Sequence, residues 1–173
     1  MKKLKLPLTL EERMQLCVGE EVLLSGVIYT ARDAAHQKMM KEGYPISLKD
    51  VVIYYVGPTP SKKNGVIGSA GPTTSSRMDW CTPRLLDAGV VATIGKGKRS
   101  KEVKEAIIRN KALYFIAIGG AGALLSARIK EMECIAYPEL DSEAIYRLYI
   151  EDFPVFVGID TQGNDIYEED ENE

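Results

Sequence analysis

Histidine and cysteine are scarce in this sequence. Its 173 residues include one histidine and three cysteines, and Cys17, Cys81 and Cys134 lie far apart, without a CxxC pair. This spacing argues against a disulfide framework, and against a zinc site or an iron–sulfur cluster held by this chain alone. We expect the three thiols to be ordinary buried or half-buried side chains, because free cysteine is commonly a core residue.

Long apolar runs are missing as well. No stretch approaches the about 20 residues that a membrane-spanning helix needs. The N-terminal MKKLKLPLTLEER also lacks the apolar core of a signal peptide. Hydrophobic residues make up 45% and charged residues 27% of the chain, a balance typical of globular proteins. We therefore expect a cytoplasmic protein with a single domain over residues 1–167.

The chain has no strong net charge. The formal net charge is −3, and five acids lie in the last six residues, EEDENE, so that the rest of the chain carries +2. We expect residues 168–173 to form an acidic, disordered tail. A mildly cationic body suits a small anionic ligand better than DNA, which calls for a stronger basic stripe.

Short apolar runs alternate with turn residues and helix caps. Strand-like runs cover residues 22–29, 51–56, 66–68, 90–94, 113–118 and 132–137, and a closing hairpin begins at 155–159. Helices are expected at 30–42 with Thr30 as N-cap, at 82–89, at 100–110, from the glycines of 119–122 to about Lys130, and briefly from Asp141. The pattern predicts an α/β domain whose ligand loops lie at strand C-termini and helix N-termini.

Several cations fall near expected helix N-termini. These cations are Arg32, Arg77, Lys96 and Lys98. A helix N-terminus carries partial positive charge, so cations gathered there indicate an anion bound where such ends converge. The alternative is that each of them is a solvated surface residue.

The segment GPTTSSRMD, residues 71–79, combines small donors with a rigid cation. Gly-Pro sets a turn, and the hydroxyls and N–H groups of 73–76 suit a nest-like loop. Arg77 can hold a carboxylate through two parallel hydrogen bonds, with Asp79 expected to orient it. The alternative is a capped turn whose hydroxyls satisfy their own backbone. The segment predicts carboxylate or phosphate binding without choosing between them.

Two further features are weaker candidates. Gly119-Gly120-Ala121-Gly122 resembles a dinucleotide loop, but that fingerprint would need glycine where Leu125 stands. Close helix–strand packing, or carboxylate contact through N–H groups such as that of Gly120, is the better interpretation. His36 is more typical of a structural than of a catalytic helical histidine, although histidine titrates near neutral pH.

Five motifs come in one order: TARDAAH (30–36), GPTTSSRMD (71–79), KGKRS (96–100), GGAGAL (119–124) and EDFPVFV…D..GND (151–165). Together they resemble the β subunit, or C-terminal domain, of the iron–sulfur hydro-lyases, namely class I fumarases and L-tartrate dehydratases. The resemblance covers roughly residues 22–167. It implies a three-layer β/β/α swivelling domain, compatible with the α/β pattern.

The resemblance also implies an activity. These enzymes reversibly hydrate fumarate to L-malate, or dehydrate tartrate to oxaloacetate. A 4Fe–4S cluster has one iron without a cysteine, and this iron acts as a Lewis acid on the substrate hydroxyl. The resemblance implies that the cluster ligands come from an α subunit and not from this chain, and that the active site lies between the two. An assembly of two α and two β subunits is the family-like expectation.

The family's site residues carry over onto matching positions. Arg32, Arg77 and Lys96 match its carboxylate-binding cations, and Thr73 matches the threonine proposed to take the C3 proton. Thr74 is a further substrate-binding candidate. Neighbouring cations would lower the pKa of Thr73 and stabilise the carbanion-like transition state. Lys98 stands where many relatives have a neutral residue, which leaves open which lysine enters the site; we favour Lys96.

Three functions stay open. The first is the β subunit of an iron–sulfur fumarate hydratase, and the second is the β subunit of an L-tartrate dehydratase. Their substrates differ by one hydroxyl, a discrimination that the sequence does not display. The third is a non-catalytic module that binds carboxylates and no partner.

Overall fold

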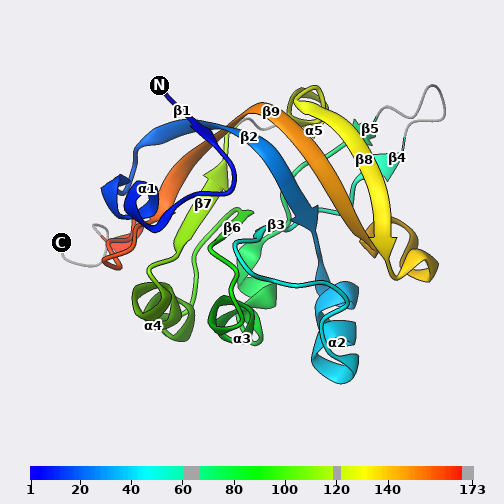
Figure 1. Ribbon diagram of the computed structural model, residues 1–173, viewed down its shortest axis with the longest axis horizontal. Helices are drawn as coiled ribbons and strands as arrows, with labels where there is room; N and C mark the ends of the chain where they lie inside the picture. The colour runs from blue at the N-terminus through cyan, green and yellow to red at the C-terminus, as the bar shows by residue number, and fades with distance from the viewer. Residues whose placement is uncertain (61–66, 119–121, 169–173) are drawn as a thin grey trace.

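One mixed sheet organises the chain. The computed structural model describes residues 1–60, 67–118 and 122–168 (Figure 1). The sheet has seven strands in the order β1 (Lys2–Lys5), β2 (Glu21–Thr30), β3 (Val52–Tyr54), β6 (Ala92–Gly95), β7 (Leu113–Ala117), β9 (Ile145–Ile159) and β8 (Ile129–Ala136). A separate two-stranded ladder joins β4 (Thr59–Pro60) to β5 (Ile67–Ser69). The expected α/β class is confirmed.

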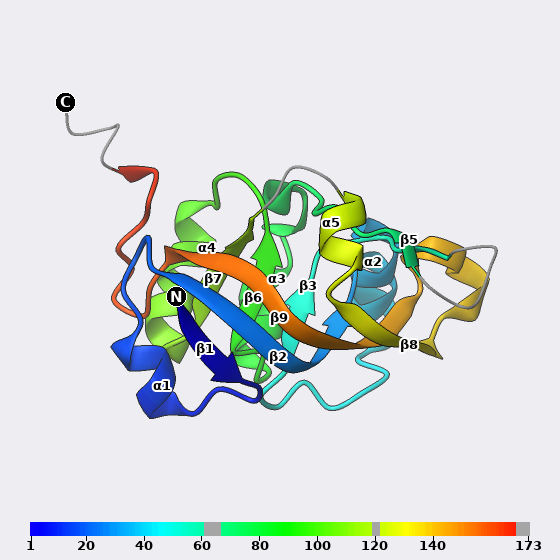
Figure 2. The same ribbon diagram turned by 90° about the horizontal axis from the view of Figure 1, so that it is seen from above.

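The sheet closes on itself. Strands β1, β2, β3, β6 and β7 are parallel neighbours, whereas β9 runs antiparallel to β7, β8 and also β2. Figure 2 shows β2 and β9 side by side, crossing over the row that β3 and β6 form. The closure covers one face of the central strands β3, β6 and β7.

Helices cover the other face of these central strands. Figure 1 shows α2 (Asp33–Glu42), α3 (Thr82–Asp87) and α4 (Lys101–Asn110) below them. The other two helices are α1 (Leu10–Gln15) and α5 (Gly122–Ser126), and the described residues also form the 3-10 turns η1 (Ser75–Met78) and η2 (Pro138–Glu143). No helix within the described residues is long and apolar enough to cross a bilayer.

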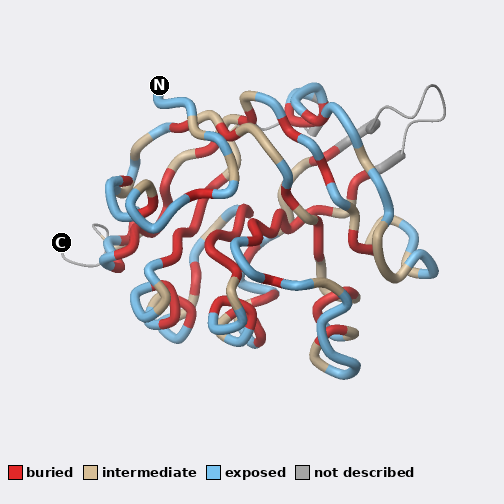
Figure 3. Tube along the Cα trace, in the orientation of Figure 1, coloured by how far each residue is buried: buried red, intermediate tan, exposed pale blue. Residues whose placement is uncertain are grey.

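Two apolar clusters lie on opposite faces of the central strands. In β7, Leu113 and Phe115 belong to the cluster under β2 and β9, whereas Tyr114 and Ile116 belong to the cluster with the helices. Figure 3 accordingly shows the central strands buried and the helices exposed on their outer side. Strands buried on both faces form nearly continuous apolar runs, which is why these runs could be recognised in the sequence.

Most expected elements exist, with shifted ends. Ser100 caps α4, since its hydroxyl accepts from the N–H of Val103 at 3.2 Å, and Gly43 ends α2. The hairpin after 155–159 is confirmed by the antiparallel bridge between Ile159 and Asp165. The fold also contains β1 and α1, which the sequence patterns did not predict.

Three local expectations are wrong. Thr30 does not cap α2: it ends β2, its hydroxyl donates to the carbonyl of Ala144 and accepts from the N–H of Tyr146, and Arg32 is the N-cap. The helix expected to reach Lys130 ends at Ser126, because β8 begins at Ile129 and pairs with β9. Asp141 lies inside η2 with a φ of 54° and caps no helix.

The acidic tail is only partly described. Glu168, its first residue, pairs with Lys104 at 2.5 Å on α4. The other tail residues, 169–173, lie outside the described residues.

Candidate active site

The candidate residues gather where parallel strands end. Arg32 follows β2 by two residues, Lys96 follows β6 directly, and Thr73 lies against the residue after β3. In α/β sheets, ligands bind outside the carboxyl ends of the strands. The three sequence motifs that contain these residues thus share one edge of the sheet.

Backbone hydrogen bonds fix the hydroxyl-rich loop to this edge. The N–H of Thr73 donates to the carbonyl of Tyr55 at 2.7 Å. Thr74 forms a parallel bridge with Lys96, whose carbonyl accepts from the N–H of Ser75 at 2.9 Å. The bonds hold Thr73 and Thr74 beside Lys96.

Ser75 is a structural member of the hydroxyl run. Its Oγ is buried 2.8 Å from the hydroxyl of Tyr114, which donates to the carbonyl of Gly97 at 2.8 Å. A Cβ added to Gly95 would lie 2.0 Å from Ser75 Oγ, so glycine at 95 makes room for this contact. Ser75 therefore anchors the loop to the buried side of the sheet edge through Tyr114 and does not face a ligand.

Arg77 pairs with an acid on another element. Its Nη2 lies 2.6 Å from Oδ2 of Asp33, in the first turn of α2, and its side chain is 51% exposed. The expectation that Asp79 orients Arg77 is wrong. Asp79 Oδ1 instead accepts from Arg99 Nε at 2.7 Å, and its Oδ2 accepts from the N–H of Ser100 at 2.7 Å.

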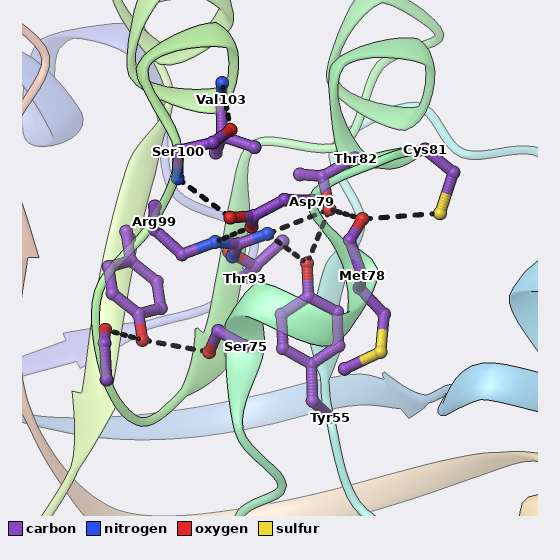
Figure 4. A network of polar contacts seen from close by, with 12 residues as sticks. Tyr55, Ser75, Met78, Asp79, Cys81, Thr82, Thr93, Arg99, Ser100 and Val103 are labelled. Atoms are coloured by element: carbon purple, nitrogen blue, oxygen red, sulfur yellow. Dashed lines mark hydrogen bonds and ion pairs between the residues drawn. The ribbon is translucent and has the colours of Figure 1, made fainter.

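Arg99 is the centre of a buried polar network (Figure 4). Beyond Asp79, its guanidinium donates to the hydroxyls of Thr93 at 3.1 Å, Tyr55 at 3.1 Å and Thr82 at 2.8 Å. Burial works against its charge, but nearby tyrosines and Asp79 raise the pKa of Arg99 overall. The network ties the loop of 71–79 to the loop of 96–100. Sequence reasoning missed it, because KGKRS alone does not show which of its cations turns inward.

Arg32 lies against a glycine. A Cβ at Gly57 would be 2.9 Å from Arg32 Nη1 and 3.1 Å from its Cδ. Arg32 Nε is buried and has no hydrogen-bond partner among the described residues. The side chain is thus confined by its surroundings while one donor stays unpaired.

His36 lies one helical turn further along α2 and is 1% exposed. Its Nδ1 is 2.7 Å from the carbonyl oxygen of Arg32. A carbonyl only accepts, so Nδ1 carries the hydrogen. Burial lowers the pKa of His36 to about 4, and the charge of Arg99 adds to this, so the ring is neutral at pH 7.

The two lysines of KGKRS face different surroundings. Both side chains are exposed, but Lys96 neighbours Thr74, whereas Lys98 lines a cavity of about 470 Å³ beside α4. That cavity also contains Lys104, which pairs with Asp165 at 3.2 Å. Gly120 lies outside the described residues.

The cysteines do not meet. Cys81 is fully buried, and burial raises the pKa of its thiol to about 12. Cys17 and Cys134 are exposed, so the expectation of buried or half-buried thiols holds only for Cys81. Within the part of the chain that the structure describes, no three histidine, cysteine or acidic side chains form a group that could hold a metal ion.

The arrangement defines a class of site. Three cations, Arg32, Arg77 and Lys96, share one open sheet edge with the hydroxyls of Thr73 and Thr74. Planar guanidinium groups match carboxylates, and separate cations match a ligand with more than one anionic group. The molecule is therefore an α/β domain suited to a small polyanionic ligand.

The chain belongs to the family described as "Fumarase C-terminus", whose model matches residues 1–170. It is 40% identical over 164 residues to "Fumarate hydratase 2" of Leishmania major, and 38% identical over 167 residues to "Fumarate hydratase class I, aerobic" of Salmonella typhimurium. These matches cover 91% and 92% of this chain but only 29% of each relative.

A shorter relative matches along most of its length. The chain is 37% identical over 173 residues to the "Putative L(+)-tartrate dehydratase subunit beta" of Methanocaldococcus jannaschii, covering 94% of this chain and 89% of that protein. The same domain thus occurs as a part of longer relatives and as nearly the whole of a shorter one.

Proposed function

We propose that this chain is the β subunit of an iron–sulfur-dependent fumarate hydratase, which reversibly converts fumarate and water to L-malate. The observation that carries the proposal is the meeting of Arg32, Thr73, Arg77 and Lys96 at one open sheet edge of a Fumarase C-terminus domain. An α subunit would complete the site.

The cations would bind and polarise the substrate carboxylates. Arg77 uses Nη2 for Asp33, which leaves its other guanidinium nitrogens for a carboxylate. Removal of a proton beside a carboxylate leaves charge on that carboxylate, and fixed cations stabilise this charge in the transition state. The preference for Lys96 over Lys98 is supported by the bridge between Lys96 and Thr74.

Thr73 would take the C3 proton. A threonine hydroxyl is a weak base, so it needs neighbouring positive charge and exclusion of water. Lys96 supplies charge near the loop, and the bond from the Thr73 N–H to Tyr55 fixes the backbone at this point. The open edge leaves water exclusion to a partner surface.

The cluster would be held by the partner. No ligand group for a metal occurs among the described residues of this chain, and its three cysteines lie apart. When bound, a 4Fe–4S cluster supplies a Lewis acid for the substrate hydroxyl. This chain's part is to hold the carboxylates and move the proton.

The proposal extends to assembly and fold. The match to a protein named as a β subunit supports a heteromer, and we propose two α and two β subunits in the cytoplasm. We also propose a domain over 1–167 with the family's three-layer β/β/α swivelling arrangement. The apolar clusters on both faces of the central strands support this arrangement.

Anaerobic capture of the tagged chain from its native lysate tests the function. We expect a second protein and iron to co-elute, and the bound material to hydrate fumarate. Material without partner or iron, and inactive on both fumarate and tartrate, would favour a carboxylate-binding module instead.

L-tartrate dehydratase is the second candidate, favoured by the relative that carries this name. The two differ in substrate by one hydroxyl, so the ratio of kcat/KM for L-malate and L-tartrate on the captured complex separates them. A ratio that favours tartrate would replace the first assignment with the second.

A further inference from the structure

We infer that His36 and Gly57 are positioning residues that hold the Arg32 side chain for a substrate carboxylate. His36 acts through its Nδ1–H, and Gly57 acts through the space it leaves. The identity of the bound group rests on the proposed function, but the hold on Arg32 is a property of this chain alone.

The first hold is on the Arg32 backbone. The carbonyl of Arg32 accepts from the backbone N–H of His36 at 3.0 Å and from its ring Nδ1–H at 2.7 Å. Arg32 is the N-cap of α2, and its own side chain makes no capping bond. The second donor fixes the peptide plane at the point where the arginine side chain leaves the chain, without using the guanidinium.

The state of the other ring nitrogen indicates that the Nδ1 hydrogen bond explains why position 36 is a histidine. His36 Nε2 is buried and has no partner among the described residues. A buried polar atom without a partner destabilises the folded chain, and an apolar side chain would avoid this penalty. The ring also packs edge-on against Tyr55, with ring centroids 5.6 Å apart, and the carbonyl of Tyr55 holds the Thr73 backbone. His36 therefore links Arg32 to the strand end that fixes Thr73.

The second hold is on the arginine side chain. A Cβ at Gly57 would lie 2.9 Å from Arg32 Nη1, 3.1 Å from its Cδ and 3.2 Å from the carbonyl oxygen of Ser142. Such approaches force a neighbour to move, so alanine at 57 would displace the guanidinium or the η2 backbone. Glycine at 57 thus leaves the space that the Arg32 side chain occupies, beside the segment that follows β3. The Nε–H of Arg32, which is buried and has no partner among the described residues, is then held in a fixed place.

Two conservative variants of His36 separate the ring nitrogens. His36→Asn puts an amide N–H near the place of Nδ1, whereas His36→Gln puts one near the place of Nε2. In the complex with the cluster-bearing partner, we expect the Asn variant to keep KM for the dicarboxylate within about threefold of wild type. We expect the Gln variant to raise KM about tenfold or more, with a smaller change in kcat. Equal KM values for the two folded variants would overturn the inference.

Gly57→Ala tests the second hold. We expect it to raise KM in the wild-type background and to have no further effect in an Arg32→Ala background, because both changes act on one side chain. Additive effects of the two changes would show that Gly57 acts elsewhere and would overturn its part.

A measurement without substrate keeps the inference apart from the proposed function. Nitrogen NMR of the labelled full chain reports which ring nitrogen of its single histidine carries the hydrogen. We expect the Nδ1–H form at pH 7, and the Nε2–H form would overturn the inference. A wild-type complex inactive on fumarate and tartrate would instead refute the proposed function. The tautomer would still test whether the His36 ring donates to the Arg32 carbonyl.

Discussion

At the scale of single residues, the arginines carry the same charge but differ in their hydrogen-bond partners and burial. Arg99 is wholly buried and bound to an acid and three hydroxyls, so its charge is used inside the protein. Arg77 is half exposed and has one acid partner, and Arg32 keeps an unpaired donor. The first arrangement stabilises loops, whereas the half-exposed side chain of Arg77 can reach a ligand and the unpaired donor of Arg32 is buried.

Arg77 and Arg109 form a matched pair for mutation. Arg109 also pairs with an acid, Asp87, and its side chain is 53% exposed against 51% for Arg77. Exposed ion pairs contribute about 0–1 kcal/mol, so Ala at either position should leave the free energy of unfolding nearly unchanged. We expect Arg77→Ala to lower kcat/KM of the complex about 100-fold or more and Arg109→Ala to leave it unchanged. If the Arg77→Ala chain unfolds, Arg77 has a structural role and the proposed site is wrong.

His36 predicts how stability depends on pH. Burial lowers its pKa from 6.5 to about 4, so between these values the unfolded chain binds a proton that the folded chain does not. Stability therefore rises with pH through this window, and acidification from pH 7 to pH 5 should remove about 2 kcal/mol through this group. Urea unfolding at both pH values measures the loss. The His36→Asn chain has no group that titrates at position 36, so its loss of unfolding free energy on acidification should be about 2 kcal/mol smaller. An identical loss in the variant would contradict the buried neutral ring.

At the scale of elements, the sequence predicts best where burial is two-sided. Strands β3, β6 and β7 were predicted because they lie in nearly continuous apolar runs, which Thr93 alone interrupts in β6. The first half of β9 was missed, because exposed Arg147 and Glu151 interrupt its apolar pattern on the side that faces solvent. Helix α5 was expected to be longer. It ends at Ser126 because pairing of β8 with β9 overrides the local helical preference.

For the candidate site, the sequence predicted where residues lie along the sheet edge but not which side chains pair. The motifs correctly brought Arg32, Thr73 and Lys96 to one sheet edge, because strand ends in a parallel sheet meet there. Asp79 was assigned to its near neighbour Arg77, but it binds Arg99, 20 positions away. Nothing local in the sequence shows where a side chain 20 positions away will lie, so this pairing depends on the fold.

The Arg99 network should behave as one unit. Arg99→Leu leaves Asp79, whose side chain is only 14% exposed, without its cation, and loss of one partner of a buried pair costs about 3–5 kcal/mol. Arg109→Leu, which breaks an exposed pair, should cost less than about 1 kcal/mol. Urea unfolding compares the two variants directly. An Arg99→Leu chain as stable as the Arg109→Leu chain would show that the two loops do not depend on this network.

At the scale of the whole molecule, the sheet edge that carries Arg77 and Lys96 is exposed to solvent. Thr74, Arg77 and Lys96 are all exposed, and no cluster ligands accompany them in the described chain. The chain spans 29% of two fumarate hydratases but 89% of a protein named as a β subunit. These facts agree with a domain that supplies one side of a shared site, whether it is fused to the other side or separate from it.

Titration of the purified chain into its separately purified, cluster-bearing partner tests this account most directly. With fumarate hydration as the readout, we expect activity to appear only on mixing and to saturate at equal amounts of the two proteins. The Thr73→Val chain should bind the partner equally well and restore almost no activity, because it keeps the shape of the loop and loses the hydroxyl. Hydration by the partner alone, or full activity with the Thr73→Val chain, would contradict the account.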